Sequence, residues 1–173
     1  MKLMVRLSSL AMLALLVAWL IALPAAAQSY DWSNTGSTGN FLNNSFFSAS
    51  ASGPTLKFKS FSTGTIVKRY LVTNTFGSAT SAIPGWTNLR AAFTDDSANG
   101  SVVIKLFKVA KCDNTETQLC EIDSSNASGV QCESCALNSS SDVDFANFSY
   151  WVEVTLARSS TSANEQIHSV ALN

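Results

Sequence analysis

The segment Phe148–Arg158 alternates apolar and polar side chains with a period of two. Because successive side chains of a strand point to opposite faces, this spacing predicts a β-strand with one buried side. The expected buried set is Phe148, Tyr150, Val152, Val154 and Leu156, and the expected opposite set is Ser149, Trp151, Glu153, Thr155 and Ala157. This strand places the strongest single constraint on the fold.

Shorter stretches of the same kind recur along the chain. Residues 102–110 are rich in β-branched and aromatic side chains, which predicts a strand buried on both faces except at Lys105 and Lys108. Turn signals such as Pro84-Gly85 and Asn99-Gly100 separate the segments. We expect further strands at residues 55–61, 65–73, 89–94, 119–123, 130–137 and 166–172. Many short strands in a chain of this length predict an all-β fold, a single antiparallel β-sandwich of the jelly-roll type.

The same periods predict the core. Val152, Val154 and Leu156 alternate cleanly, and Ile104 and Leu106 lie in the most apolar of the expected strands. We therefore expect these five side chains to be buried together. No segment after residue 27 has the spacing of a convincing amphipathic helix.

The N-terminal segment predicts export of the protein. Lys2 and Arg6 precede an apolar run at residues 10–23, and three alanines at 25–27 fit a peptidase cleavage site. The alternative is a membrane anchor, but the run is shorter than the ~20 residues that a membrane span needs. We therefore expect residues 1–27 to be a cleaved signal peptide, with no stable membrane insertion and a mature protein outside the cell or on its surface.

Residues 28–53 differ from the rest of the chain, since they are rich in Ser, Asn and Gly with scattered aromatic residues. One interpretation is a leader that packs loosely on the domain. The other is an extended arm whose apolar residues, Phe46 and Phe47 above all, enter a groove of the same molecule or of a neighbouring copy. Either interpretation assigns residues 54–173 to the β-sandwich, and we expect its strands to hold a complete core without the arm.

The charge of the chain excludes some partners. Eleven basic and twelve acidic residues give a net charge of −1, and loss of the basic N-terminal residues makes it more negative. Nucleic acids and anionic membranes both reward a basic surface, so we expect neither as a partner. Charged residues make up only 13% of the chain, about half of the usual share.

Four cysteines lie close together at positions 112, 120, 132 and 135. In an exported protein an even number of cysteines predicts disulfides, here two. Of the three pairings, we favour Cys112 with Cys120 across a hairpin and Cys132 with Cys135; Cys120 with Cys132 and Cys112 with Cys135 is equally symmetric. Zinc is the competing interpretation, but the first spacing is too wide for a zinc knuckle. A redox role of the C-x-x-C segment lacks a βαβ context.

The sequence gives no support for catalysis. The single histidine, His168, falls in a short expected strand, and no nucleophile elbow, metalloprotease motif or phosphate loop occurs. The carboxylates that a glycosidase would need fall mostly in turns. We therefore expect that the protein is not an enzyme, with a small secreted hydrolase as the weakest alternative.

Two small groups of residues are candidates for ligand binding. Asp142 and Asp144 alternate in a polar loop and could offer oxygen ligands to calcium; we expect no other cofactor. Trp86 follows a Pro-Gly turn, where an exposed ring could stack on a sugar, although core packing explains it equally well. We expect Trp151 to pack on its sheet rather than to meet a ligand.

These observations predict a secreted, non-catalytic β-sandwich with a structural or adhesive extracellular role, self-assembling through its N-terminal arm. The alternative is a stand-alone carbohydrate-binding module. The expected partners are accordingly a second copy of the chain or a surface glycan. A solvent-facing aromatic strip on the sandwich would favour the glycan, and a stable polymer would favour assembly.

Overall fold

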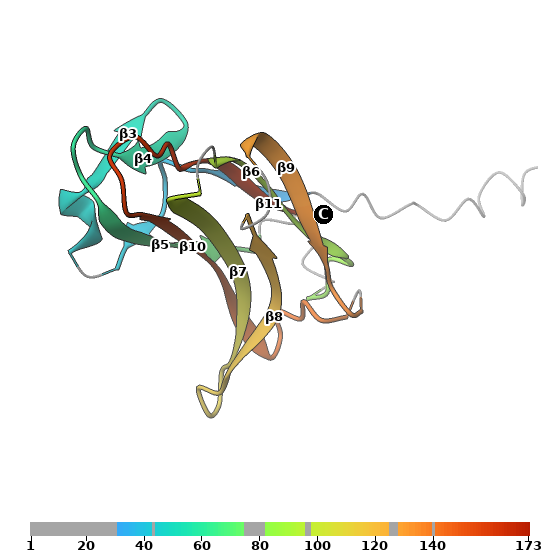
Figure 1. The fold of residues 1–173 in the computed structure, drawn as a ribbon. Helices are drawn as coiled ribbons and strands as arrows, with labels where there is room; N and C mark the ends of the chain where they lie inside the picture. The colour runs from blue at the N-terminus through green and yellow to red at the C-terminus, as the bar shows by residue number, and fades with distance from the viewer. Residues whose placement is uncertain (1–30, 43, 75–81, 96–97, 125–127, 140) are drawn as a thin grey trace, which may run out of the picture.

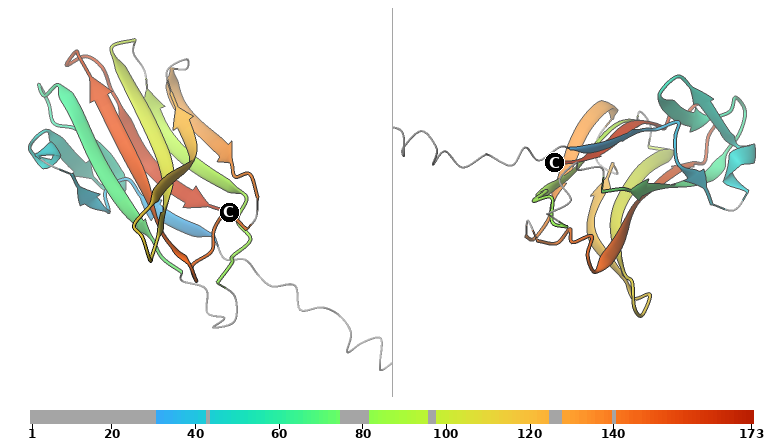
Figure 2. Two further views of the ribbon diagram at one scale, coloured as in Figure 1. Left: turned by 90° about the horizontal axis from the view of Figure 1, so that it is seen from below. Right: turned by 180° about the vertical axis from the view of Figure 1, so that it is seen from behind.

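The computed structural model describes residues 31–42, 44–74, 82–95, 98–124, 128–139 and 141–173. These residues form two antiparallel sheets that pack face to face (Figures 1 and 2). The strands are β1 (Trp32–Thr35), β2 (Asn40–Phe41), β3 (Ala49–Ser52), β4 (Thr55–Phe58), β5 (Gly64–Val72), β6 (Asn88–Asp95), β7 (Gly100–Ala110), β8 (Glu116–Asp123), β9 (Gly129–Ala136), β10 (Phe148–Arg158) and β11 (Gln166–Leu172). The predicted β-sandwich is confirmed; the predicted signal peptide lies outside the described residues.

The six-stranded sheet has the order β3-β4-β11-β6-β9. Strand β1 is its sixth member and pairs with β11, on the side of β11 away from β6. The ladder between β11 and β6 shifts register between Ile167 and Ser169, so His168 lies at an irregularity of the strand. Strand β11 is therefore paired on both sides.

The five-stranded sheet has the order β2-β5-β10-β7-β8. Strand β10, predicted with these same bounds, pairs with β5 on one side and with β7 on the other. Strands β7 and β8 continue into a long hairpin that projects from the body of the sandwich (Figure 1). The described residues include no helix long and apolar enough to cross a bilayer.

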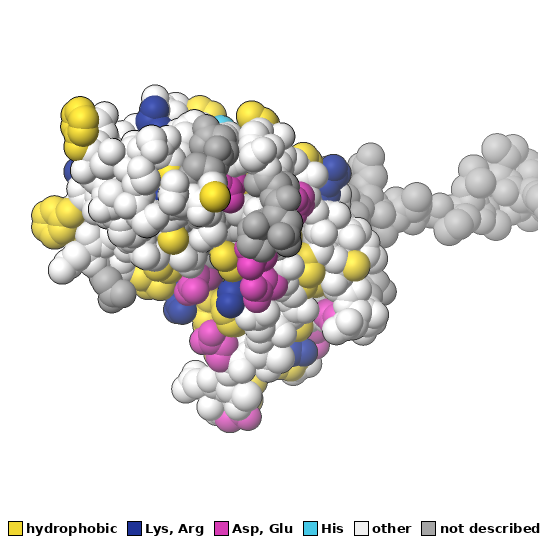
Figure 3. Space-filling view, viewed as in Figure 1, with side chains coloured by type: hydrophobic (Ala, Val, Ile, Leu, Met, Phe, Trp, Pro, Cys, Tyr) yellow, Lys and Arg dark blue, Asp and Glu magenta, His cyan; other side chains and the backbone are white. Residues whose placement is uncertain are grey.

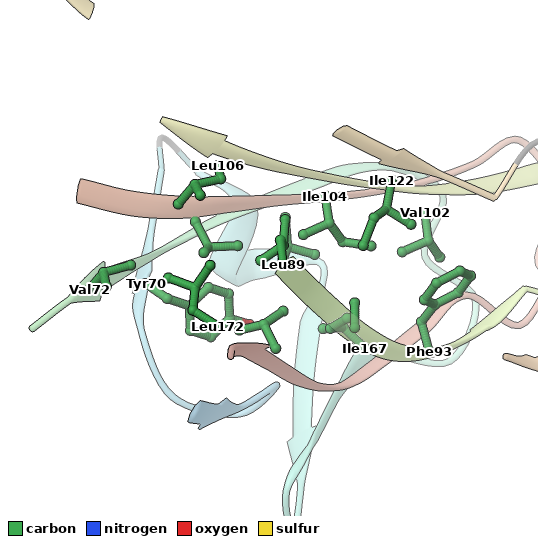
Figure 4. Close-up of a cluster of buried hydrophobic side chains, with 14 of the residues drawn as sticks. Tyr70, Val72, Leu89, Phe93, Val102, Ile104, Leu106, Ile122, Ile167 and Leu172 are labelled. Carbon is green, nitrogen blue, oxygen red and sulfur yellow. The ribbon is translucent and has the colours of Figure 1, made fainter. Parts of the chain in front are cut away.

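The core lies between the sheets, where alternate side chains of both layers meet (Figure 4). Val152, Val154 and Leu156 are fully buried, and so are Ile104 and Leu106, as the sequence predicts. The other face of β7 departs from the prediction. Val103 and Phe107 are only half-buried, because that face of the sheet meets solvent instead of a second layer.

The described part of the segment 28–53 is folded into the sandwich of its own molecule. Strands β1 and β3 belong to the six-stranded sheet, and β2 belongs to the five-stranded sheet. Trp32 at the start of β1 is buried in the core. These residues are therefore structural strands and not a loosely packed leader.

Candidate ligand-binding face

The outer face of the five-stranded sheet carries an apolar row that crosses three strands. Trp151 of β10 lies between Leu71 of β5 and Phe107 of β7 in the two ladders. Leu71 is 63% exposed, while Trp151 and Phe107 are half-buried. The rings of Trp151 and Phe107 have centroids 5.9 Å apart and planes inclined by 31°. The sheet thus presents an aromatic pair and an aliphatic side chain to solvent.

A row of alternating charge runs beside the apolar row. Glu153 pairs with Arg69 on one side and Lys105 on the other, and Lys105 in turn pairs with Glu121 of β8. Arg69 Nε donates a hydrogen bond to Glu153 Oε2 at 2.8 Å, and Lys105 Nζ lies 3.3 Å from Glu121 Oε2. The order across the sheet is positive, negative, positive, negative, so the row carries hydrogen-bonding groups of both signs without net charge.

The two rows are joined at Trp151. The Arg69 guanidinium lies over the indole ring, 4.8 Å from its centroid. The indole Nε1 is buried and has no hydrogen-bond partner among the described residues. Figure 3 shows acidic, basic and hydrophobic side chains gathered over β5, β10, β7 and β8. We define these two rows together as the outer face.

Trp86 is not part of any exposed surface. Its side chain is fully buried in the core, where its ring meets that of Phe145 edge-on with centroids 6.0 Å apart. The loop before β6 carries the residue, as expected, but turns it inward. Trp86 has no exposed ring face for a sugar, which corrects its assignment as a ligand-binding residue.

Asp142 and Asp144 use their carboxylates to fold their own loop. Asp142 Oδ2 accepts a hydrogen bond from the Ser139 N–H, and Asp144 accepts one from Ala146 N–H and another from the Asn147 side chain. These bonds, first the one from Asn147, lower the pKa of Asp144. No third metal-ligating side chain joins them among the described residues, so the calcium site stays a prediction without a ligand set of three.

His168 is held by two hydroxyl groups. Its Nδ1 lies 3.0 Å from Thr55 Oγ1, and its Nε2 lies 2.9 Å from Thr94 Oγ1. Both ring nitrogens are therefore engaged with neighbouring strands.

Two surface hollows have no carboxylate in their walls. One is lined by Gly64, Asn99 and Ser159, and the other by Lys57, Phe61 and Asn164. Neither offers the paired carboxylates of a glycosidase.

Phe46 and Phe47 lie on a 3-10 helix, η1 (Ser45–Phe47), between β2 and β3. They are 49% and 62% exposed, and their ring centroids are 3.9 Å apart.

The four cysteines are thiols in this structure: Cys112 and Cys132 are exposed, Cys120 is buried and Cys135 is half-buried.

The outer face was missed from the sequence because its residues come from four strands. The alternation in β10 already places Trp151 and Glu153 on the side opposite the core. Only the register between strands brings Leu71, Phe107 and Lys105 beside them. A pattern along one strand cannot supply that register.

No family model and no curated protein sequence matches the chain. Solved structures of two other proteins are similar to parts of the chain at low TM-scores. A family two carbohydrate esterase from Cellvibrio japonicus has a TM-score of 0.39 and 11% identity over 83% of this chain and 33% of its own. The VP2 subviral particle of infectious bursal disease virus has a TM-score of 0.39 and 7% identity over 83% of this chain and 32% of its own. The chain thus spans about a third of these proteins, and likenesses this low support no argument about function.

Proposed function

We propose that this protein is an extracellular, non-catalytic β-sandwich that acts in adhesion by binding an extended glycan across its outer face. The observation that supports the proposal is the row Leu71, Trp151 and Phe107 beside the row of alternating charges. Aromatic rings offer large, rigid apolar area to the C–H face of a sugar. The ion-paired side chains offer donors and acceptors to its hydroxyl groups.

The size of the face favours a chain of sugars over a single ring. Neighbouring strands lie ~4.8 Å apart, so the path from β5 to β8 is about 14 Å long. The sheet positions these groups on rigid strands, which lowers the entropy lost on binding. The neutral balance of the charged row suits an uncharged polysaccharide better than an anionic one.

The test is retention of the purified mature chain on immobilised polysaccharides, a neutral β-glucan and an anionic glycan among them. We expect Trp151→Ala to weaken retention roughly tenfold, since it removes the largest apolar group of the face. Leu71→Ser, at an exposed position, should weaken retention without loss of stability. Phe61→Ser is the matched control, because Phe61 is the most exposed large apolar side chain among the described residues and lies outside both rows.

Equal retention of Leu71→Ser, Phe61→Ser and the unchanged chain would overturn the proposal. So would a failure of the unchanged chain to bind any member of a broad polysaccharide panel. Far-ultraviolet circular dichroism and a melting curve on each variant separate loss of binding from loss of folding.

The exposed pair Phe46 and Phe47 favours a second candidate, self-assembly through the N-terminal segment. Two adjacent apolar rings, tilted by 33° on the exposed 3-10 helix η1, form a small anchor for a second copy. Sedimentation of the mature chain at rising concentration tests it. The double variant Phe46→Ser, Phe47→Ser should then shift the chain toward monomer, while Phe61→Ser should not. A monomeric unchanged chain would remove this candidate.

A further inference from the structure

Cys120 and Cys135 face each other across the open side of the sandwich. Strand β8 is the edge of the five-stranded sheet, and β9 is the edge of the six-stranded sheet. Cys120 lies opposite Leu106 in its ladder, and Cys135 lies opposite Leu89 in the other. Cys120 belongs to the core cluster, and Cys135 packs against that cluster.

The contact between the two cysteines is close. Cys120 Sγ lies 3.7 Å from the backbone oxygen of Cys135. Burial, and then the hydrogen bond and charge of the Cys135 thiol, raise the pKa of Cys120. The Cys120 thiol of one sheet therefore lies against Cys135 of the other sheet.

The ladders argue against the pairing of Cys112 with Cys120. Cys112 lies beyond the end of β7, whereas Cys120 lies opposite Leu106 within that strand. The four residues from Leu106 to the end of β7 alone span about 13 Å, and a disulfide joins Cα atoms less than ~7 Å apart. Pairing across the hairpin would break the register.

The pairing of Cys132 with Cys135 is equally unsuited to β9. The two residues are three positions apart in one strand, so their side chains point to opposite faces. The exposed Cys132 thiol lies beside Arg90 Nη2, while Cys135 turns toward the core. Three residues of extended chain also span about 10 Å, beyond the reach of a disulfide.

We propose that Cys120 and Cys135 form a disulfide that joins the two sheets along the β8–β9 edge. The chemistry is exchange with a disulfide-bearing oxidant, either a small-molecule disulfide or a protein one. The more accessible Cys135 thiolate attacks one sulfur of the oxidant, and the other sulfur leaves as a thiol. Cys120, after losing its proton, displaces the mixed disulfide at Cys135 and releases the second thiol. Two protein thiols and one oxidant disulfide thus give one protein disulfide and two oxidant thiols.

Among the described residues, this bond would be the only covalent link between the two sheets other than the backbone. Because its loop is about fifteen residues long, reduction should lower the melting temperature by roughly 10 °C. This disulfide is independent of the proposed glycan ligand, because Cys120 and Cys135 do not belong to the outer face.

Digestion after glutamate can test the pairing directly. Cleavage after Glu116, Glu121 and Glu133 places the four cysteines on four separate peptides. The mature chain is incubated with glutathione disulfide, free thiols are alkylated in acidic denaturant, and the peptides are identified by mass. We expect the peptide of Cys120 linked to the peptide of Cys135, with Cys112 and Cys132 not linked to either.

Cys132→Ser is the matched control, because it removes an exposed thiol of the same strand. We expect it to keep both the link and the melting temperature, while Cys135→Ala loses the link and makes melting insensitive to reductant. A link between the peptides of Cys112 and Cys120, a link between those of Cys132 and Cys135, or alkylation of all four thiols after oxidation would overturn the proposal. The mapping uses the unchanged chain, so it stands even if a variant fails to fold.

Discussion

Trp32 lies opposite Leu172 in the ladder between β1 and β11, and both side chains are buried. The N-terminal segment and the C-terminal strand therefore complete one layer of the core together. The sequence pattern separates residues 28–53 from the sandwich, but the described residues of that segment supply three of its strands. The assembly hypothesis, in which the segment leaves its own molecule for a neighbour, would require those strands to separate first.

Trp32→Ala should destabilise the fold by about 3–5 kcal/mol, because it leaves a large cavity beside Leu172. Urea unfolding monitored by circular dichroism measures the loss. Ser33→Ala, at the neighbouring exposed position, is the control.

We also expect deletion of residues 28–53 to abolish cooperative unfolding, in contrast to the folded remnant predicted from the sequence. A truncated chain with a sharp transition would contradict this.

Val154→Asp should cost several kcal/mol of stability. Val154 is fully buried in the middle of β10, between Ile104 of β7 and Lys68 of β5. The new carboxylate would lose the packing against Ile104 and its hydration, and its charged neighbour, the buried Lys68 ammonium, already donates to Ser37 O. Thermal melting checks the effect. Ser149→Asp places the same charge on an exposed position of the same strand and should melt within a few degrees of the unchanged chain.

Gly36→Ala should destabilise the fold although it adds only one carbon. A Cβ there would meet the backbone oxygen of Ile167, which cannot move without disturbing β11. The same residue donates a backbone hydrogen bond to His168 O at 2.8 Å and accepts one from the Tyr70 hydroxyl at 2.8 Å. Ser37→Ala is the control, and an unchanged unfolding midpoint for Gly36→Ala would show that the loop is not so tightly docked.

Lys68 predicts a pH dependence of stability. Its ammonium group is buried on the core side of β5, donates to Ser37 O at 2.6 Å and lies 4.5 Å from the Phe41 ring centroid. Burial lowers the pKa of Lys68, so the unfolded chain binds more protons between that lowered pKa and the ordinary value of 10.5. Stability from this residue therefore rises as the pH increases through that window.

The measurement is urea unfolding at several pH values from neutral to about 10, for the unchanged chain and for Lys68→Met. Methionine keeps the apolar stem and removes the titrating group. We expect the free energy of unfolding of the unchanged chain to rise relative to that of Lys68→Met as the pH increases. Parallel curves for the two proteins would show that Lys68 titrates in the fold as it does in water.

The sequence predicts the inner strands well because each carries its own alternation. The alternation from Phe148 to Arg158 predicts both the strand and its buried face. Strands β1, β2 and β3 were not predicted, since they are two to four residues long, polar, and held in place by partners remote in sequence. Trp86 shows the same limit: its loop was recognised, but burial against Phe145 depends on a tertiary contact.

The cysteines and the outer face depend on that same missing information. Symmetry around a turn favours Cys112 with Cys120, whereas the strand register moves them apart and brings Cys135 to Cys120. Likewise, Trp151 alone predicts only a packed ring. Its position between Leu71 and Phe107 becomes visible when three strands are aligned.

Strand β11 lies inside the six-stranded sheet, with β6 on one side and with β1 and β4 sharing the other. It is also made after every strand that it contacts. On the ribosome, β1, β4 and β6 emerge without the element that joins them, and this layer cannot close until residues 166–172 have been added. Such long-range pairing slows folding and exposes unpaired strand edges in the meantime. Closure of this sheet thus waits for the seven residues of β11, and a chain interrupted before them would lack an inner strand of the sheet.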